Sequence, residues 1–201
     1  MKFFQTVIIF LLFNQFCFAQ TFKEEISAYR EQYKKDFLEQ ERSPLKEDDI
    51  QYLRFFDADE AFRVIASFKE TEKPAPFDMP TLNGKTKKFI RFGTLSFVIQ
   101  NIECRLGIYQ NVTLMENPEF KDHLFLPFTD ESNGEESYIN GRYLDFKTSN
   151  IDNGKLVIDF NKAYNPYCAF SDGYNCPKPP LENNLSVKIN AGEKNFGKQT
   201  H

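Results

Sequence analysis

The stretch Ile102-Glu103-Cys104-Arg105-Leu106-Gly107-Ile108-Tyr109 decides the fold class. Every second residue in it is apolar, starting from Ile102, and polar or small residues stand between them. A period of two places successive side chains on opposite faces of a β-strand. The alternation therefore predicts a strand whose buried face includes Cys104, and a thiol in that position is predicted to be an inert part of the core.

The sequence on both sides of this stretch continues the β pattern. Strands are predicted at residues 63–69, just before Asn83, and at 85–92, 95–99, 124–128, 137–146, 155–160 and 185–189. Asn83-Gly84 is the strongest hairpin signal in the chain. Turn residues at 130–134 and 152–154 join the later strands. Connections this short favour a meander of adjacent antiparallel strands.

Helical sequence precedes the strands. Apolar and aromatic residues recur at spacings of three and four, at Phe22, Ile26, Tyr29, Tyr33 and Phe37. This stripe is typical of an amphipathic helix, and we interpret it as a surface that packs on the domain. Ser43-Pro44 predicts the start of a second short helix that reaches about Leu53.

Together these elements predict an α+β fold. We expect the N-terminal amphipathic helix and the short second helix to pack on a curved antiparallel β-sheet, barrel- or sandwich-like, with a long ordered C-terminal loop.

The first residues have the layout of a secretory signal peptide: Lys2, an apolar run over 7–13, and small residues at Cys17 and Ala19. We predict cleavage after Ala19 and a periplasmic or secreted protein. A membrane anchor is the alternative, but the apolar run falls short of the roughly 20 residues of a spanning helix. Lipid attachment at Cys17 is a second alternative, which the bulky Phe16 disfavours.

The predicted domain organisation follows from this processing. Residues 1–19 form the signal peptide, 20–60 an N-terminal helical segment, 61–195 an antiparallel β domain that folds as one unit with 20–60, and 196–201 a polar tail. No membrane span is expected after signal cleavage.

Composition narrows the partners. The formal net charge of the 201 residues is −4, and no Lys/Arg cluster occurs, so nucleic acid is excluded as a predicted partner. The chain has 23 Phe, 9 Tyr and no Trp, which predicts a core rich in phenyl rings. No glycine-rich phosphate loop occurs and no motif demands flavin or haem, so no cofactor is predicted.

Loss of the signal peptide leaves three cysteines, Cys104, Cys168 and Cys176. In an oxidising compartment the last two, which are close in sequence, are the natural disulfide pair. A metal site is the competing interpretation. Because these cysteines lack CxxC spacing and His123 is the single histidine inside the domain, no metal is predicted. His123 itself is interpreted as a turn or surface residue.

The disulfide would lie in a segment without any helical or alternating period, residues 163–182. Loops this long are functional, disordered or stapled to the surface. Aromatic residues, among them Tyr164, Tyr167 and Tyr174, argue against disorder. Asparagines such as Asn161, Asn165 and Asn183 can satisfy backbone donors and acceptors in an ordered loop.

Several long motifs resemble the DUF1684 family, domain of unknown function 1684, found in bacteria and archaea. The matching stretches are 159–170, 176–185 and 191–194, supported by 43–45, 52–56, 124–128 with Asp130, 134–138 and 141–144. An export signal followed by such a domain is similar to members from Bacteroidetes-type bacteria, which implies the periplasm. The resemblance implies no reaction.

The resemblance does single out residues on its motifs. As candidate ligand-binding residues we take Asp130, Arg142, Asp159, Asn161, Asn165, Asn183 and Glu193, with Cys168 and Cys176 as the disulfide. Two interpretations of Arg142 stay open. It pairs with Asp159 across neighbouring strands as a structural contact, or it faces a pocket beside Asp130 or Glu193 and binds a carboxylate or phosphate.

Three functions are compatible with these residues. The first is an exported domain that binds a small molecule or an envelope component, with the irregular segment lining the site. The alternative is a hydrolase of unknown substrate that uses carboxylates such as Asp130, Asp159 or Glu193 as acid and base. A third, cofactor binding on a small barrel, rests on analogy of fold alone. Catalytic residues are not identified.

Overall fold

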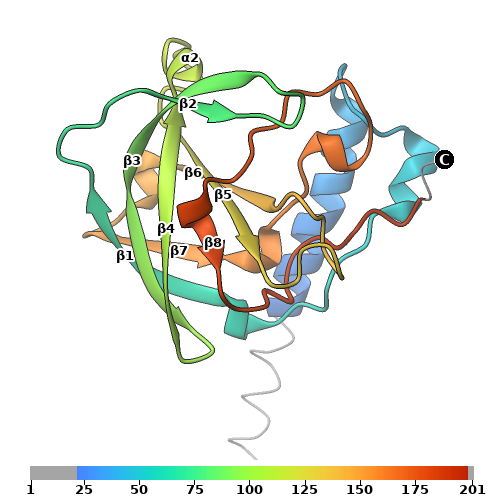
Figure 1. The fold of residues 1–201 in the computed structure, drawn as a ribbon. Helices are drawn as coiled ribbons and strands as arrows, with labels where there is room; N and C mark the ends of the chain where they lie inside the picture. The colour runs from blue at the N-terminus through green and yellow to red at the C-terminus, as the bar shows by residue number, and fades with distance from the viewer. Residues whose placement is uncertain (1–21, 199–201) are drawn as a thin grey trace, which may run out of the picture.

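A computed structural model of the chain describes residues 22–198, so the predicted signal peptide and its cleavage site lie outside the described residues. Figure 1 shows a curled antiparallel sheet with the N-terminal helix (22–39, blue) standing to one side of it. The C-terminal segment, orange to red, passes between the two. This arrangement confirms the α+β fold on a curved antiparallel sheet.

The sheet has eight strands, and its main path runs in the order β6-β5-β4-β3-β1-β7. The strands are β1 (Arg63–Glu70), β2 (Phe77–Pro80), β3 (Thr86–Ile99), β4 (Ile102–Asn111), β5 (His123–Asp130), β6 (Arg142–Lys147), β7 (Lys155–Asp159) and β8 (Asn184–Leu185). Strands β3 to β6 form the predicted meander. Strand β7 returns to pair with β1, β2 pairs with β3, and β8 adds to β5 in the parallel sense.

One face of the sheet carries the main core. Side chains from β1, β3, β4, β5, β6 and β7 meet there, including Leu95, Leu106, Leu126 and Ile158, all fully buried. Cys104 belongs to the same cluster, as the alternation in β4 predicts, and burial raises the pKa of its thiol.

Strand β3 was predicted as two separate strands, 85–92 and 95–99. It is one continuous strand with a β-bulge between Arg91 and Gly93. The bulge adds one residue, and this reverses which side chains face the main core. Before it, Phe89 lies on the outer face; after it, Leu95 lies in the core. The Phe68 ring lies against Gly93, where a Cβ atom would come within 2.2 Å of Phe68 Cε2.

The outer face at one end of the sheet carries a second cluster. It contains Met79, Phe89, Tyr109, Phe125 and Tyr143, packed with Phe77 and Tyr164. Because β5 contributes to both clusters, it is buried almost throughout its length. Tyr109 lies on the face of β4 opposite Cys104, and it is also fully buried, because the C-terminal segment covers this face.

Three further elements are shorter than their predictions. The second helix is a 3₁₀ helix, η1 (Glu47–Tyr52). Residues 137–141 form turns that lead into β6, and β8 has two residues only. The remaining short helices are η2 (Glu60–Phe62), α2 (Val112–Met115), η3 (Thr148–Asn150), η4 (Phe160–Lys162), η5 (Tyr167–Ala169) and η6 (Leu181–Asn183). Within residues 22–198, no helix combines the length and apolarity needed to cross a membrane.

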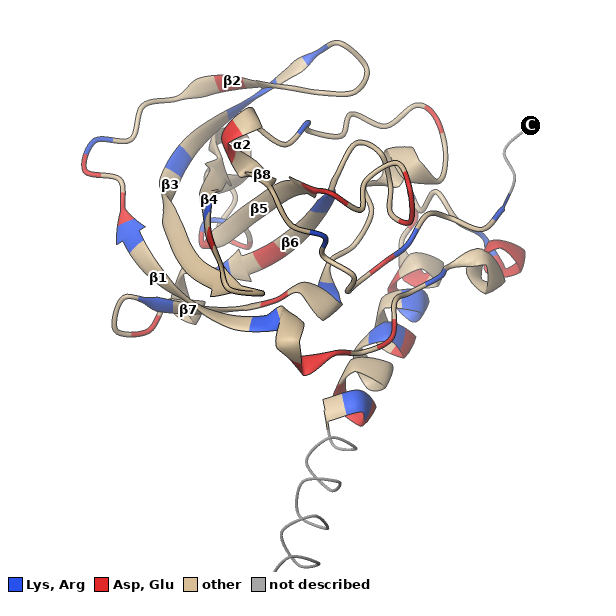
Figure 2. Cartoon of the chain, turned by 60° about the horizontal axis from the view of Figure 1, so that its bottom comes forward, with Lys and Arg blue, Asp and Glu red and all other residues tan. Residues whose placement is uncertain are grey.

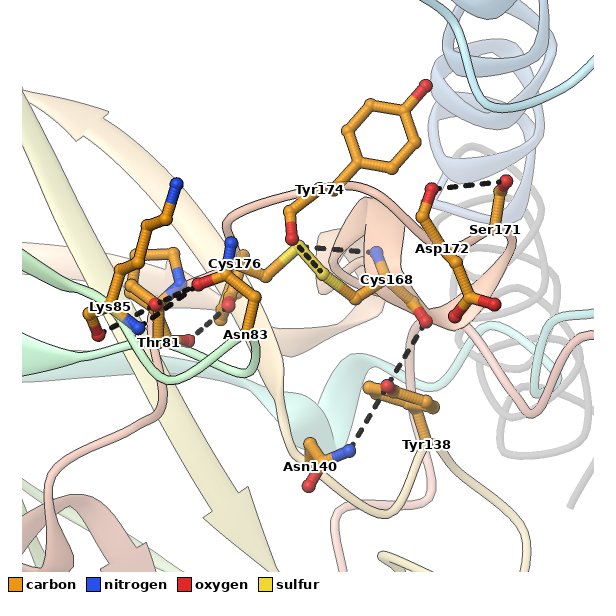
Figure 3. The surroundings of a disulfide bond; sticks show 12 residues. Thr81, Asn83, Lys85, Tyr138, Asn140, Cys168, Ser171, Asp172, Tyr174 and Cys176 are labelled. Atoms are coloured by element: carbon orange, nitrogen blue, oxygen red, sulfur yellow. Dashed lines mark hydrogen bonds between the residues drawn. A yellow bond between two sulfur atoms is a disulfide. The ribbon is translucent and has the colours of Figure 1, made fainter.

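The C-terminal segment is ordered and held by a disulfide between Cys168 and Cys176, as predicted (Figure 3). Backbone hydrogen bonds tie it to the β2–β3 hairpin, where Leu82 N–H donates to Cys176 O at 2.9 Å and Lys178 N–H donates to Pro80 O at 2.8 Å. On the other side, the Tyr138 hydroxyl donates to Cys168 O. The cross-linked loop therefore forms a fixed wall against the outer face of the sheet.

The C-terminal part of the N-terminal helix packs on this wall. Phe37 contacts Tyr167 and Phe170 with ring centroids 5.8 and 5.5 Å apart. The predicted apolar stripe of this helix faces the protein, since Phe22, Ile26 and Phe37 are buried. Figure 2 shows both signs of charge mixed along the opposite, solvent-facing part of the helix.

Candidate functional site

Arg142 is fully buried and enclosed by protein groups. Its guanidinium donates to Asp130 Oδ2 at 2.8 Å, to Ile189 O at 2.8 Å and to the backbone oxygens of Ala191 and Glu193. Both members of the Arg142–Asp130 pair are 0% exposed. Asp130 also accepts from the backbone of Ile189, so the pair ties β5 and β6 to the C-terminal segment.

This arrangement answers the two interpretations of Arg142. Its carboxylate partner is Asp130, whereas Asp159 pairs with Arg63. Nor does Arg142 face a pocket. Burial lowers the pKa of the guanidinium, and the charge of Asp130 opposes that shift. We call Arg142, Asp130 and the surrounding carbonyls of residues 189, 191 and 193 the Arg142 cluster.

Glu193 lies next to this cluster and is 0% exposed. Its Oε2 accepts from the Tyr33 hydroxyl at 2.9 Å and from Asn165 N–H at 2.8 Å, while its Oε1 has no hydrogen-bond partner within the described chain. Burial raises the pKa of the carboxyl to about 8, despite the hydrogen bonds and the charge of Arg142 that favour ionisation. Gly192, with φ +77, precedes it at a point where a Cβ would lie 2.6 Å from two carbonyl oxygens.

Asp159 and Asn161 form a separate group at the end of β7. Asp159 pairs with Arg63, its register partner on β1, at 2.7 Å. Asn161 binds both the N–H and the C=O of Asp59, at 2.9 and 2.8 Å. The two side chains therefore fasten the turn before β1 to the end of β7.

Asn183 replaces a missing stretch of ladder between β4 and β5. These strands pair at Tyr109 and Phe125, a register that would bring Gly107 opposite Pro127. Pro127 has no N–H to donate. The Asn183 amide lies in the gap instead, accepting from Gly107 N–H at 2.7 Å and donating to Gly107 O and Pro127 O.

The seven predicted ligand-binding residues are thus all buried and bonded to protein groups. Asp130, Arg142, Asn165 and Glu193 gather where the C-terminal segment meets β5 and β6. Asp159 and Asn161 lie together elsewhere, and Asn183 stands alone. Their role in ligand binding stays a prediction. Their contacts favour a structural role, in which they support the wall of the cavity described next. The carboxylates that a hydrolase would need do not converge on one open site.

A cavity of about 530 Å³ lies between the outer face of the sheet, the N-terminal helix and the disulfide loop. Its volume is within the range of small-molecule sites. Nine aromatic residues line it: Tyr29, Tyr33, Phe37, Phe89, Phe125, Tyr143, Tyr164, Tyr167 and Tyr174. We call this space the aromatic cavity.

The period-two pattern of three strands explains the sheet wall of the cavity. Lys87 and Phe89 on β3, His123 and Phe125 on β5, and Asp145 on β6 all project from the same face. The opposite wall comes from one side of the N-terminal helix. The disulfide loop closes a third side with residues 174–177.

All six tyrosine hydroxyls of the wall already have partners. Tyr29 donates to Lys162 O, Tyr33 to Glu193, Tyr143 to Pro177 O, Tyr164 to Asp145, Tyr167 to Gln40 and Tyr174 to Arg42 O. The tyrosines therefore offer the cavity their rings, and their hydroxyls hold the walls together. Stacking and apolar contact are the interactions that such a surface provides.

A small polar group lies within the aromatic wall. His123 Nε2 is 2.9 Å from Asp145 Oδ1, and Asp145 also accepts from Tyr164. His123 Nδ1 and Asn175 Oδ1 are buried without a hydrogen-bond partner among residues 22–198. Burial lowers the pKa of Lys87, and no carboxylate offsets it. No group of three or more His, Cys, Asp or Glu side chains in this part of the chain could hold a metal ion.

Sequence reasoning missed this polar group. His123 was interpreted as a turn or surface residue, but it begins β5 and lines the cavity. Lys87 and Asp145 were not singled out at all. The alternation of side chains along the strands was the available signal, since Lys87 lies on the same face as Phe89, and His123 on the same face as Phe125. Which face the C-terminal segment would cover could not be read from one strand alone.

The fold and the cavity define a small α+β domain with a curled antiparallel sheet and an aromatic-lined hollow on its outer face. The profile of the family described as "Protein of unknown function (DUF1684)" matches residues 48–194. The chain belongs to the DUF1684 family.

A solved structure is similar to this chain. The solution NMR structure of an uncharacterised protein from Haloarcula marismortui matches with a TM-score of 0.66 and 30% sequence identity, covering 88% of this chain and 95% of the other. No curated protein matches the chain.

Proposed function

We propose that this protein is an exported binding protein for a small molecule or envelope component with a flat, largely apolar body, which it holds in the aromatic cavity. The observation that carries the proposal is the set of nine aromatic side chains around about 530 Å³, with every tyrosine hydroxyl bonded to protein. A wall of this kind favours a ligand that stacks, because few of its hydrogen-bonding groups remain available.

Export is supported by the disulfide and by the signal-peptide pattern. Cys168 and Cys176 are joined, and such bonds persist in oxidising compartments. The N-terminal pattern and the resemblance to Bacteroidetes-type members favour the periplasm. Fractionation of cells that express the full chain, followed by mass spectrometry, tests this: we expect a mature protein that begins at Gln20. A cytoplasmic protein that retains residues 1–19 would contradict it.

A neutral aromatic fluorophore tests the binding proposal. N-phenyl-1-naphthylamine emits strongly in apolar surroundings, and we expect saturable binding with one site per chain. Asn175→Trp should block the cavity, because Asn175 lines it and its Oδ1 has no partner to lose. We expect its affinity for the fluorophore to fall at least about tenfold.

The matched control is Ser171→Trp, which adds the same ring to an exposed position of the same loop, outside the cavity. This variant should bind the fluorophore like the wild type. Absence of saturable binding, or equal affinities for both tryptophan variants when both remain folded and disulfide-bonded, would contradict the proposal.

A further inference from the structure

Lys87 differs from the other charged side chains around the cavity because it has no partner among residues 22–198. Two carboxylates line the cavity, and both receive protein donors: Asp145 from His123 and Tyr164, and Asp36 from Gln32 at 2.8 Å. The Lys87 ammonium has no hydrogen bond or ion pair within residues 22–198, although it is half-buried. The neighbouring Lys88, on the other face of β3, pairs with Asp78 at 3.2 Å.

A second unengaged group lies on the same sheet face. His123 holds Asp145 through Nε2, and its Nδ1 is buried without a partner in the described chain. In the tautomer that donates from Nε2 to Asp145, Nδ1 is a hydrogen-bond acceptor. Partly buried polar groups without partners carry a desolvation cost that a complementary ligand group removes. Lys87 therefore lacks an acceptor that carries a negative charge, whereas His123 lacks a donor.

From this we infer that the ligand of the aromatic cavity is a flat acid, whose carboxylate binds Lys87 while its apolar body lies among the aromatic rings. A single lysine balances one negative charge, which favours a carboxylate over a doubly charged phosphate group. The inference rests on the proposed binding function and adds the chemical class of the ligand.

Two isosteric compounds separate the inference from the proposal on which it rests. 2-Naphthoate and 2-naphthamide share a flat ring system, but only the first carries a negative charge at neutral pH. Each is titrated against the complex of the protein with N-phenyl-1-naphthylamine, and the loss of fluorescence gives an inhibition constant. We expect the naphthoate to displace the fluorophore at least about tenfold more strongly than the amide.

Lysine variants localise the effect. Lys87→Met keeps the length of the side chain and removes the charge, so we expect the preference for the naphthoate to disappear while the fluorophore still binds. Lys88→Met, with the same substitution on the opposite strand face, should keep the preference. Circular dichroism and melting temperature verify that both variants fold.

The outcomes are distinguishable. Equal displacement by acid and amide, or a preference that survives in Lys87→Met, overturns the inference and leaves the binding function standing. Binding of the fluorophore without displacement by either compound also overturns it. A fluorophore that does not bind the wild type overturns the proposed function itself.

Discussion

The Arg142 cluster and the aromatic cavity each contain a cation, but the surroundings of the two cations differ. Arg142 is surrounded by one carboxylate and three backbone carbonyls, with no exposed surface. Lys87 lies in a wall of rings with no counter-charge from the described chain. The first cation has a counter-charge from the protein, whereas the second lacks an anion. Residues on the family motifs, such as Arg142, can therefore have a structural role. The side chain without a partner, Lys87, lies at a strand position that no motif singles out.

The most direct test of this difference is to replace the cation of each region by methionine. We expect the larger loss of stability in the Arg142 cluster. Arg142→Met leaves Asp130 buried without its cation and removes donors from three carbonyls. We expect the free energy of unfolding to fall by about 3 to 5 kcal/mol, as when one member of a buried ion pair is removed. Chemical denaturation measures it.

Arg105→Met on the exposed side of β4 is the control for that measurement, and its effect should stay within about 0.5 kcal/mol. If Arg142→Met is too unstable to purify while Arg105→Met is normal, the predicted direction still holds. Equal stabilities of the two variants would show that the cluster is not a structural centre.

Glu193 lies between the Arg142 cluster and the aromatic cavity, and the pH dependence of stability tests its protonation state. Its pKa in the folded protein is about 8, above the usual 4.5. The folded state therefore holds more protons than the unfolded state between these values, so the free energy of unfolding falls as pH rises through the interval. Between pH 5 and 8 we expect a loss on the order of 3 kcal/mol from this group.

Glu193→Gln keeps an acceptor for Tyr33 and Asn165 but carries no titrating proton. Its stability should therefore lack this decline, and the difference between variant and wild type should grow towards pH 8. Urea denaturation at several pH values measures both proteins. Parallel curves across the range would show that Glu193 is ionised in the fold.

The disulfide provides the third test, because it belongs to the cavity wall and not to the Arg142 cluster. Replacing both Cys168 and Cys176 by serine should lower the free energy of unfolding by about 2 to 3 kcal/mol, as expected for a small closed loop. It should also weaken binding of N-phenyl-1-naphthylamine, since Cys176 and Pro177 line the cavity.

Alkylation of the denatured mature protein gives a direct check on the bond. We expect one reactive thiol, Cys104, before reduction and three after it. Three reactive thiols without reductant would remove the basis of this prediction.

The smallest expected effect completes the comparison. Lys87→Met removes a partly buried charge that no protein group compensates, so the free energy of unfolding should stay within about 0.5 kcal/mol of wild type or rise slightly. The same denaturation experiment as for Arg142→Met measures it. A loss comparable to that of Arg142→Met would mean that Lys87 has a structural partner.

Much of the fold could be predicted from local sequence, and the site could not. The alternation in β4, the Asn83-Gly84 hairpin and the stripe of the N-terminal helix are local patterns, and each corresponds to an observed element. The bulge at Gly93 was missed because it depends on the Phe68 ring from another strand. The partners of Arg142 and Asp159 depend on strand order, which no local pattern reveals.

The cavity was missed for a related reason. Tyr29 and Tyr33 show the spacing of a packing surface, and they do pack, but through their hydroxyls and ring edges around an empty volume. A helical stripe looks the same whether it covers a solid core or a hollow one. The asparagines were interpreted as closing backbone hydrogen bonds, and Asn183 does this in the gap beside Pro127.

The cavity is bounded by the two ends of the chain, since residues 29–40 form one wall and residues 164–177 another, with the strands between them. During synthesis the helix precedes the disulfide loop by more than a hundred residues. The cavity is therefore completed late, and a chain that ended before residue 164 would lack one of its walls.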